Sequence, residues 1–113
     1  MSEDGCVFCK IARGEEESEV VCDEEGVLAF HNVNGKAPVH VLVIPKEHVS
    51  SLAETEWLPE AVAKRIFEVA QKAAEKTGVS ESGYVFRINN GADAGQEIFH
   101  LHAHVMGGER MEM

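Results

Sequence analysis

The sequence predicts an α+β domain built on a single antiparallel β-sheet of about five strands, with one main α-helix and a short N-terminal helix. Segments with β-branched or alternating apolar residues outnumber helical ones, and most are joined by short, hairpin-like connections. A single long segment, residues 57–77, repeats its apolar positions with a helical period. No repeat, low-complexity linker or domain boundary interrupts the chain, so we expect residues 1–113 to form one domain.

Five segments carry the strand pattern. A tight turn containing Gly26 separates the first two, and Asn34-Gly35 followed by Pro38 marks a loop before the third. The third segment, VHVLVIP, is rich in β-branched residues and ends at Pro45. A glycine-rich loop, NGADAGQE, precedes the last segment. The predicted strands cover residues 19–23, 27–31, 39–45, 83–89 and 98–106.

The main helix is predicted between Trp57 and Thr77. Its apolar residues fall on one helical face, while most of the charged residues lie off that face. Pro59 is acceptable in a first turn, and Gly78 suits the C-terminal cap. The predicted buried face consists of Leu58, Val62, Ile66, Val69, Ala70 and Ala73.

Composition limits the partners and the compartment. The formal net charge of −10, from 20 acids and 10 bases, argues against nucleic-acid binding through a general phosphate-attracting surface. A small phosphorylated ligand held by a few local donors is compatible with that charge. No apolar stretch approaches the roughly 18 residues that span a bilayer, and the acidic start lacks the apolar core of a signal peptide. We therefore expect a cytoplasmic protein with no membrane partner, in which the three cysteines bind metal or stay reduced.

Three histidines alternate with apolar residues near the end of the chain, in HLHAHVMGG at residues 100–108. In an extended strand alternate side chains share one face, so His100, His102 and His104 are predicted on one side and the apolar residues on the core side. Imidazole near neutral pH can act as nucleophile, base or acid. Three interpretations stay open: phosphoryl chemistry, a catalytic zinc with three histidine ligands, and histidines that merely make a pH-sensitive strand or satisfy core hydrogen bonds.

The segment HLHAHVM resembles the His-x-His-x-His-x-x signature, x being apolar, of the histidine-triad nucleotide-binding family. NNGADAGQEIF resembles that family's approach loop, HVLVIPKEHVS its earlier histidine-bearing strand and LAFHNVNGKAP its nucleotide-side loop. The resemblance runs from Cys6 to Gly108, and the Gly-Gly after the triad resembles the phosphoramidase branch more than the dinucleoside polyphosphate hydrolase branch.

The resemblance implies an enzyme that hydrolyses P–N or phosphoanhydride bonds of purine nucleoside monophosphate derivatives, without a catalytic cofactor. It also implies a homodimer formed through the main helix and the neighbouring strand. Two alternatives stay open, a non-catalytic purine nucleotide-binding regulatory module and a dinucleoside polyphosphate hydrolase.

Roles of individual residues follow from the resemblance. His102 would attack the α-phosphorus and form a covalent nucleotidyl-histidine, which water then hydrolyses. His104 would contact the phosphate and assist the leaving group, His40 would support the triad, and His100 would orient His102. The expected phosphate-binding groups are Asn89 and the backbone around Gly95 and Gln96.

The resemblance also implies a nucleoside pocket. Asn32 stands where the family usually carries an aspartate that binds ribose hydroxyls, so it keeps hydrogen-bonding capacity but not charge. Glu97 stands where some members carry a serine that touches phosphate, and we leave it out of the phosphate contacts. The expected nucleoside-binding residues are Phe8, Ile11, Phe30, His31, Asn32, Val33 and Leu42.

A second site is predicted at the front of the chain. Cys6-x-x-Cys9 has a spacing that suits zinc, although the alternative is a pair of reduced thiols that pack as small hydrophobes. The resemblance extends to family members that carry a structural zinc, and it implies the ligands Cys6, Cys9, His48 and His100. Cys22, in a predicted strand, is expected to be a packing residue.

Overall fold

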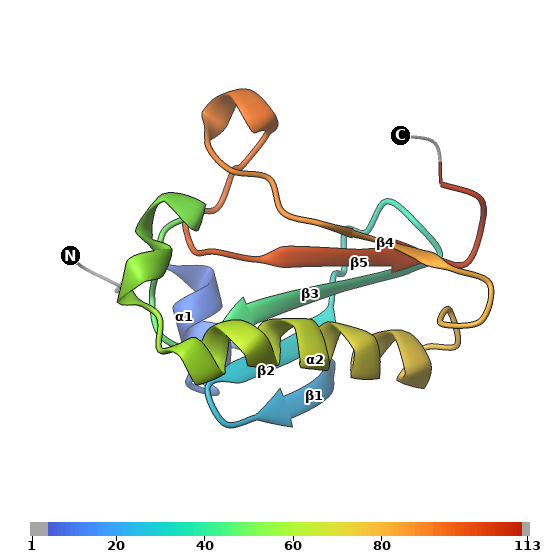
Figure 1. Cartoon of the computed structure of the whole chain (residues 1–113), viewed down its shortest axis with the longest axis horizontal. Coiled ribbons are helices and arrows are strands. Elements are labelled where there is room, and N and C mark those ends of the chain that lie inside the picture. The colour runs from blue at the N-terminus through green and yellow to red at the C-terminus, as the bar shows by residue number, and fades with distance from the viewer. Residues whose placement is uncertain (1–4, 112–113) are drawn as a thin grey trace.

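A five-stranded antiparallel sheet forms the centre of the computed structural model, which describes residues 5–111 and confirms the predicted α+β class. The first four and last two residues of the predicted domain lie outside the described residues. The strands lie side by side in the order β1-β2-β3-β5-β4, and α2 runs along the sheet (Figure 1). They are β1 (Val20–Glu24), β2 (Val27–His31), β3 (Val39–Pro45), β4 (Tyr84–Arg87) and β5 (Ala103–Gly107).

The two faces of the sheet carry separate apolar clusters. Alternation along β2 and β3 sends Ala29 and Val43 toward α2 (Glu60–Lys76), where they join the larger core cluster. The intervening residues Phe30 and Leu42 join a smaller cluster on the other face, which α1 (Val7–Ala12) covers. The short N-terminal helix and the packing role of Cys22, which is buried in the larger cluster, are confirmed.

The main helix is shorter than the predicted range 57–77. Pro59 has an extended backbone (φ −58°, ψ 145°) and caps the helix, so α2 begins at Glu60. The preceding turns form a 3₁₀-helix, η1 (Leu52–Trp57), which the sequence pattern did not predict. Gly78 follows the C-cap with a left-handed φ of 83°, as predicted. Among residues 5–111, no helix has the length and apolar character needed to cross a membrane.

The last strand begins later than predicted, at Ala103 instead of residue 98. Its partner β3 ends at Pro45, which has no N–H to continue the ladder, and the N–H of Leu101 donates instead to the carbonyl of Val49 at 2.6 Å. Residues 98–102 therefore approach the sheet as irregular chain. Even so, Leu101 and Ala103 are buried in the larger core cluster, so the predicted alternation of histidines and apolar residues is kept.

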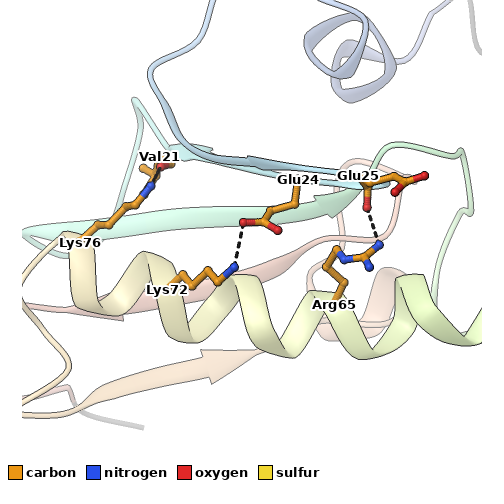
Figure 2. A network of polar contacts seen from close by, with 6 residues as sticks. All are labelled: Val21, Glu24, Glu25, Arg65, Lys72 and Lys76. Atoms are coloured by element: carbon orange, nitrogen blue, oxygen red, sulfur yellow. Dashed lines mark hydrogen bonds and ion pairs between the residues drawn. The ribbon is translucent and has the colours of Figure 1, made fainter.

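Basic side chains of α2 contact the β1 edge of the sheet, three strands away from β5 (Figure 2). Lys72 pairs with Glu24 at 2.9 Å, Arg65 donates to the carbonyl of Glu25 at 2.8 Å, and Lys76 donates to the carbonyl of Val21 at 3.0 Å. The ion pair lowers the pKa of Glu24 and raises that of Lys72. Because such surface contacts contribute little individually, they orient β1 on α2 more than they stabilise the fold.

Candidate active site

The sheet register sets four side chains in one row on the face that carries α1. Phe30 of β2 pairs with Leu42 of β3, Leu42 pairs with His104 of β5, and His104 pairs with Arg87 of β4. A cavity of about 640 Å³ lies over this row, within the roughly 300–1,000 Å³ typical of small-ligand sites. Along the row, the apolar Phe30 and Leu42 come first and His104 and Arg87 follow.

Twelve of the predicted catalytic and nucleotide-binding residues line this cavity, and two, His100 and Gln96, do not. Val33 is 86% exposed and lies at the rim. Asn32 uses its side-chain oxygen to accept from the N–H of Asn34 at 3.1 Å, which stabilises its own loop. His100 and Gln96 are buried and do not line the cavity. The twelve are Phe8, Ile11, Phe30, His31, Asn32, Val33, His40, Leu42, Asn89, Gly95, His102 and His104.

His40 and His104 form a hydrogen-bonded pair whose proton positions follow from their partners. The N–H of Lys36 donates to Nδ1 of His40 at 2.9 Å, so the proton of the neutral His40 ring lies on Nε2. That Nε2 is 2.9 Å from Nδ1 of His104, to which it donates. The remaining proton of a neutral His104 is then on Nε2, where it can serve as a donor at the cavity.

Burial keeps both rings of this pair neutral at pH 7. Burial is the first cause of the lowered pKa of His40, followed by the charges of Arg87 and Lys36. For His104, burial and then the neighbouring His102 and His40 lower the pKa to about 4. A neutral His104 donates a hydrogen bond to an anion without giving up its proton.

His102 is held in a tautomer that leaves one nitrogen unprotonated. Its Nδ1 is 2.8 Å from the carbonyl oxygen of His100, and because a carbonyl only accepts, Nδ1 carries the proton. Nε2 of the neutral ring then keeps its lone pair. The ring lines the cavity, where its centroid is 5.1 Å from that of His104 and 5.1 Å from that of Phe8. An imidazole with a free lone pair at a cavity can act as a nucleophile.

The loop between β4 and β5 is braced by its own amides. Asn89 donates to the carbonyl of Ala94 at 2.7 Å and keeps a second amide proton for other partners. The buried Gln96 accepts from the N–H of Gly91 and donates to the carbonyls of Ser50 and Ile98. The side chain of Gln96 therefore shapes the loop that ends at the histidines.

The four predicted metal ligands, Cys6, Cys9, His48 and His100, lie close together outside the cavity. Their ligand atoms all lie within 4.8 Å of one another. Nδ1 of His100 is 3.4 Å from Sγ of Cys6 and 3.5 Å from Sγ of Cys9, and Nδ1 of His48 is 3.2 Å from Sγ of Cys9.

These separations fit tetrahedral zinc. Zinc bonds of about 2.3 Å to sulfur and about 2.0 Å to nitrogen place tetrahedral S and N ligands roughly 3.5 Å apart. Nε2 of His100 lies 2.8 Å from the carbonyl of Pro45, an outer contact that directs Nδ1 toward the sulfurs. The group can hold a metal. The triad rings themselves diverge, because His100 faces the cysteines and His104 faces His40, so the geometry favours this site over one built from three histidines.

Phe8 of α1 connects the two sites. It is 4% exposed, and its ring meets those of Phe30, His100 and His102 edge-on, with centroid separations of 5.7, 5.9 and 5.1 Å. Cys6 caps the same helix, since its sulfur accepts from the N–H of Cys9. A metal held by the cysteines would therefore fix the wall of the cavity against His102.

Several charged residues that line the cavity were missed by the sequence analysis. Arg87, Lys36 and Glu17 were not predicted, and Glu97, which is not expected to contact phosphate, also lines the cavity. Arg87 could have been predicted from the sequence. It lies two residues before Asn89 in a predicted strand, and residues two apart in a strand lie on the same face of the sheet, so Arg87 is on the face of a predicted phosphate ligand.

Comparison with known proteins agrees with this geometry. A model of the HIT domain family matches residues 13–111. Protein HitA of Neisseria gonorrhoeae is 36% identical over 104 residues, which cover 92% of this chain and 96% of that protein. The purine nucleoside phosphoramidase of Escherichia coli K12 is 35% identical over 102 residues, covering 90% of this chain and 86% of that one.

Solved structures give the same result. A HIT family hydrolase from Clostridium thermocellum has a TM-score of 0.93 and 41% identity, covering 99% of this chain and 97% of its own. A HIT family hydrolase from Legionella pneumophila has a TM-score of 0.90 and 37% identity, covering 96% of each chain. With the histidines, the sheet and the comparisons in agreement, the chain belongs to the HIT domain family.

Proposed function

We propose that this protein is a hydrolase that releases nucleoside monophosphates from purine nucleoside phosphoramidates, through a covalent nucleotidyl-histidine. The name of the Escherichia coli relative supports the substrate class. The observation that carries the proposal is the bond from Nδ1 of His102 to the carbonyl of His100, because it leaves Nε2 as a lone pair at the cavity.

In the first step, Nε2 of His102 forms a bond to the α-phosphorus while the P–N bond of the substrate breaks. The amine leaves with the electron pair of that bond and takes up one proton. Because His104 is neutral in the free protein and its Nδ1 accepts from His40, this proton enters on the substrate itself and leaves with the amine. The Nε2–H of His104, oriented by His40, donates a hydrogen bond to the phosphate and so assists departure of the amine.

In the second step, water attacks phosphorus, the bond to His102 breaks and one proton is lost. The second amide proton of Asn89 is the donor left for the phosphate oxygens. The backbone around Gly95 and Gln96, which was also expected to bind phosphate, does not offer donors, because the N–H of Gly95 donates to the carbonyl of Ala92 and the N–H of Gln96 to the carbonyl of Gly91. The aromatic and aliphatic end of the cavity, with Phe8, Phe30 and Leu42, takes the purine and ribose.

The mechanism is tested by intact-mass spectrometry of the native protein and of His102→Ala after brief mixing with adenosine 5′-phosphoramidate. We expect an acid-labile adduct of one AMP on the native protein alone, together with release of AMP. If the native protein gives neither adduct nor AMP, the hydrolase proposal fails. If it nevertheless binds AMP, and His102→Ala binds it equally well, a non-catalytic nucleotide-binding module becomes the better account.

We further propose that Cys6, Cys9, His48 and His100 hold a structural zinc ion. When bound, the metal would supply a cross-link between α1 and the segment that carries the nucleophile, and no chemistry at phosphorus. Metal content measured on protein purified without added metal tests this, with one zinc per chain as the expected value. A metal content well below half per chain in freshly purified, folded protein would refute it.

We also propose a homodimer through α2 and β4. β4 is an edge strand, and next to it Phe67 of α2 is 65% exposed. The ring of Phe67 contacts that of Phe86 in a tilted arrangement, with a centroid separation of 5.3 Å. Light scattering coupled to gel filtration should give twice the chain mass. Phe67→Glu should shift that mass toward one chain, whereas a monomeric native protein would exclude the proposal.

A further inference from the structure

Arg87 occupies a distinctive place in the cavity. Phe86 and Ile88 pack against the larger core cluster, so Arg87 between them lies on the opposite face of the sheet, the face of the histidines. It pairs in register with His104 and lines the cavity. No feature of the reaction proposed above uses it.

The guanidinium group of Arg87 has an unmet hydrogen-bonding requirement. Its Nε is buried and has no hydrogen-bond partner within residues 5–111. A buried N–H without an acceptor is unfavourable, so the guanidinium group is not anchored through Nε and gains by turning toward an anion that enters the cavity. Lys36 lies at the same end of the cavity, and the charges of both residues act on His40 and His104. Arg87 and Lys36 therefore supply positive charge beside the histidines, in a chain whose net charge is −10.

The row across the sheet indicates which part of a substrate would meet Arg87. It runs from Phe30 and Leu42 at the apolar end, through His104, to Arg87 on the edge strand. With the nucleoside over β2 and β3 and the phosphorus beside His102, the group that remains extends toward β4. That group is the leaving group.

We propose that Arg87 is a specificity-determining residue that binds an anionic group, a carboxylate or a phosphate, on the leaving group. The preferred substrates would then be nucleotides joined by a P–N bond to an acidic amine, such as an amino acid, instead of to ammonia or a neutral amine. This inference rests on the proposed function. A guanidinium fork is well suited to the task because it binds both kinds of oxyanion through paired N–H bonds.

The test compares two substrates of equal size, adenosine 5′-phosphoro-N-alanine and its neutral carboxamide. We expect the native protein to favour the carboxylate. In Arg87→Gln the ratio of the two kcat/KM values should fall roughly 10- to 100-fold, the range of one charge-assisted hydrogen bond. Arg87→Lys should restore part of the ratio, because it keeps the charge but not the fork. A change common to both substrates cancels in the ratio.

The matched control is Arg65→Gln, the same substitution on α2, where Arg65 faces the carbonyl of Glu25 on the opposite side of the sheet (Figure 2). Its ratio should equal that of the native protein. A third substrate, α,β-imido-ADP, carries a phosphate instead of a carboxylate. Loss confined to this substrate or to the alanine conjugate identifies the anion, and loss with both shows that either is accepted.

An unchanged ratio in Arg87→Gln would overturn the proposal. An equal loss with the charged and the neutral substrate would also overturn it, because Arg87 would then serve the α-phosphate. If the native protein hydrolyses neither substrate, the proposed reaction fails, and calorimetric Kd values for the same two compounds decide the role of Arg87. A Kd ratio that depends on Arg87 supports anion selection, and one that does not refutes it.

Discussion

Gly35 is predicted to hold His40 in place because it lacks a side chain. It lies in the loop between β2 and β3, and its φ is outside the left-handed region, so conformational freedom does not explain it. A Cβ at this position would lie 2.7 Å from Cβ of His40 and 3.1 Å from the carbonyl oxygen of Asn32. Neither neighbour is the flexible end of a side chain. In Gly35→Ala the loop would have to retreat by about 0.7 Å to reach ordinary contact.

That retreat would weaken the bond from the N–H of Lys36 to Nδ1 of His40, currently 2.9 Å long. Overpacking costs about 1–3 kcal/mol, and the lost hydrogen bond about 1 kcal/mol. We therefore expect Gly35→Ala to lower the free energy of unfolding by about 2–4 kcal/mol. Without its acceptor role at Nδ1, His40 no longer fixes the tautomer of His104. Turnover should fall roughly 10- to 100-fold, as for other small displacements of a catalytic group.

Urea unfolding and hydrolysis of adenosine 5′-phosphoramidate measure the two effects. Gly5→Ala is the matched control, because a Cβ at Gly5 would meet nothing within 4 Å. The control should leave the unfolding free energy within about 0.5 kcal/mol of the native value. If Gly35→Ala is equally stable and turns over normally, the loop does not position His40.

Three further predictions concern His104, the cysteines and Phe8. The unfolded chain binds a proton at His104 near pH 6.5 and the folded chain at about 4, so the native protein loses stability as the pH falls through this window. Between pH 7 and 4, the free energy of unfolding of His104→Gln in urea should fall by about 1–2 kcal/mol less than that of the native protein, a difference that allows for partial solvent screening. If both free energies fall equally, the pKa of His104 is not lowered. Cys9→Ser should abolish stoichiometric metal binding and the sensitivity of Tm to a chelator, whereas Cys22→Ala, which alters a core thiol, should keep both. Phe8→Leu should weaken AMP binding in calorimetry and lower the unfolding free energy by about 1–2 kcal/mol, and normal AMP affinity would show that Phe8 is not part of the nucleoside wall.

The elements of the fold were predictable because their signals are local. Pro45 ends β3 and Gly78 ends α2 through backbone restrictions that any chain would meet at those residues. The start of the last strand was not predictable by the same reasoning. Alternation continues from residue 98 onward, and only the position of Pro45 in the neighbouring strand ends the ladder at Ala103. The same limit applies to Gly35, which the sequence marks as a turn residue and the fold uses for its closeness to His40.

The sequence predicts which residues belong to the site, but not which partners each of them contacts. Histidines at alternate positions indicate one shared face, yet their partners come from distant segments, such as Lys36 for His40 and the cysteines for His100. Arg87 shows the limit most clearly. The proposed role of Arg87 depends on the register between β4 and β5, which places it beside His104. It also depends on a guanidinium nitrogen that has no acceptor within the described residues.

The peptide unit of His100 couples the candidate metal-ligand group to His102, the proposed nucleophile. The ring of His100 faces Cys6 and Cys9, while its carbonyl accepts the proton of Nδ1 of His102. A change in the backbone at this residue therefore alters both the ligand geometry and the tautomer that frees Nε2 of His102. Cys6, Cys9, His48 and His100 do not line the cavity and are connected to it through this link and Phe8. Loss of the proposed metal should therefore lower turnover without removing any contact to phosphate. In Cys9→Ser, kcat should accordingly fall more than affinity for AMP, the pattern of a positioning defect and not of a lost ligand contact.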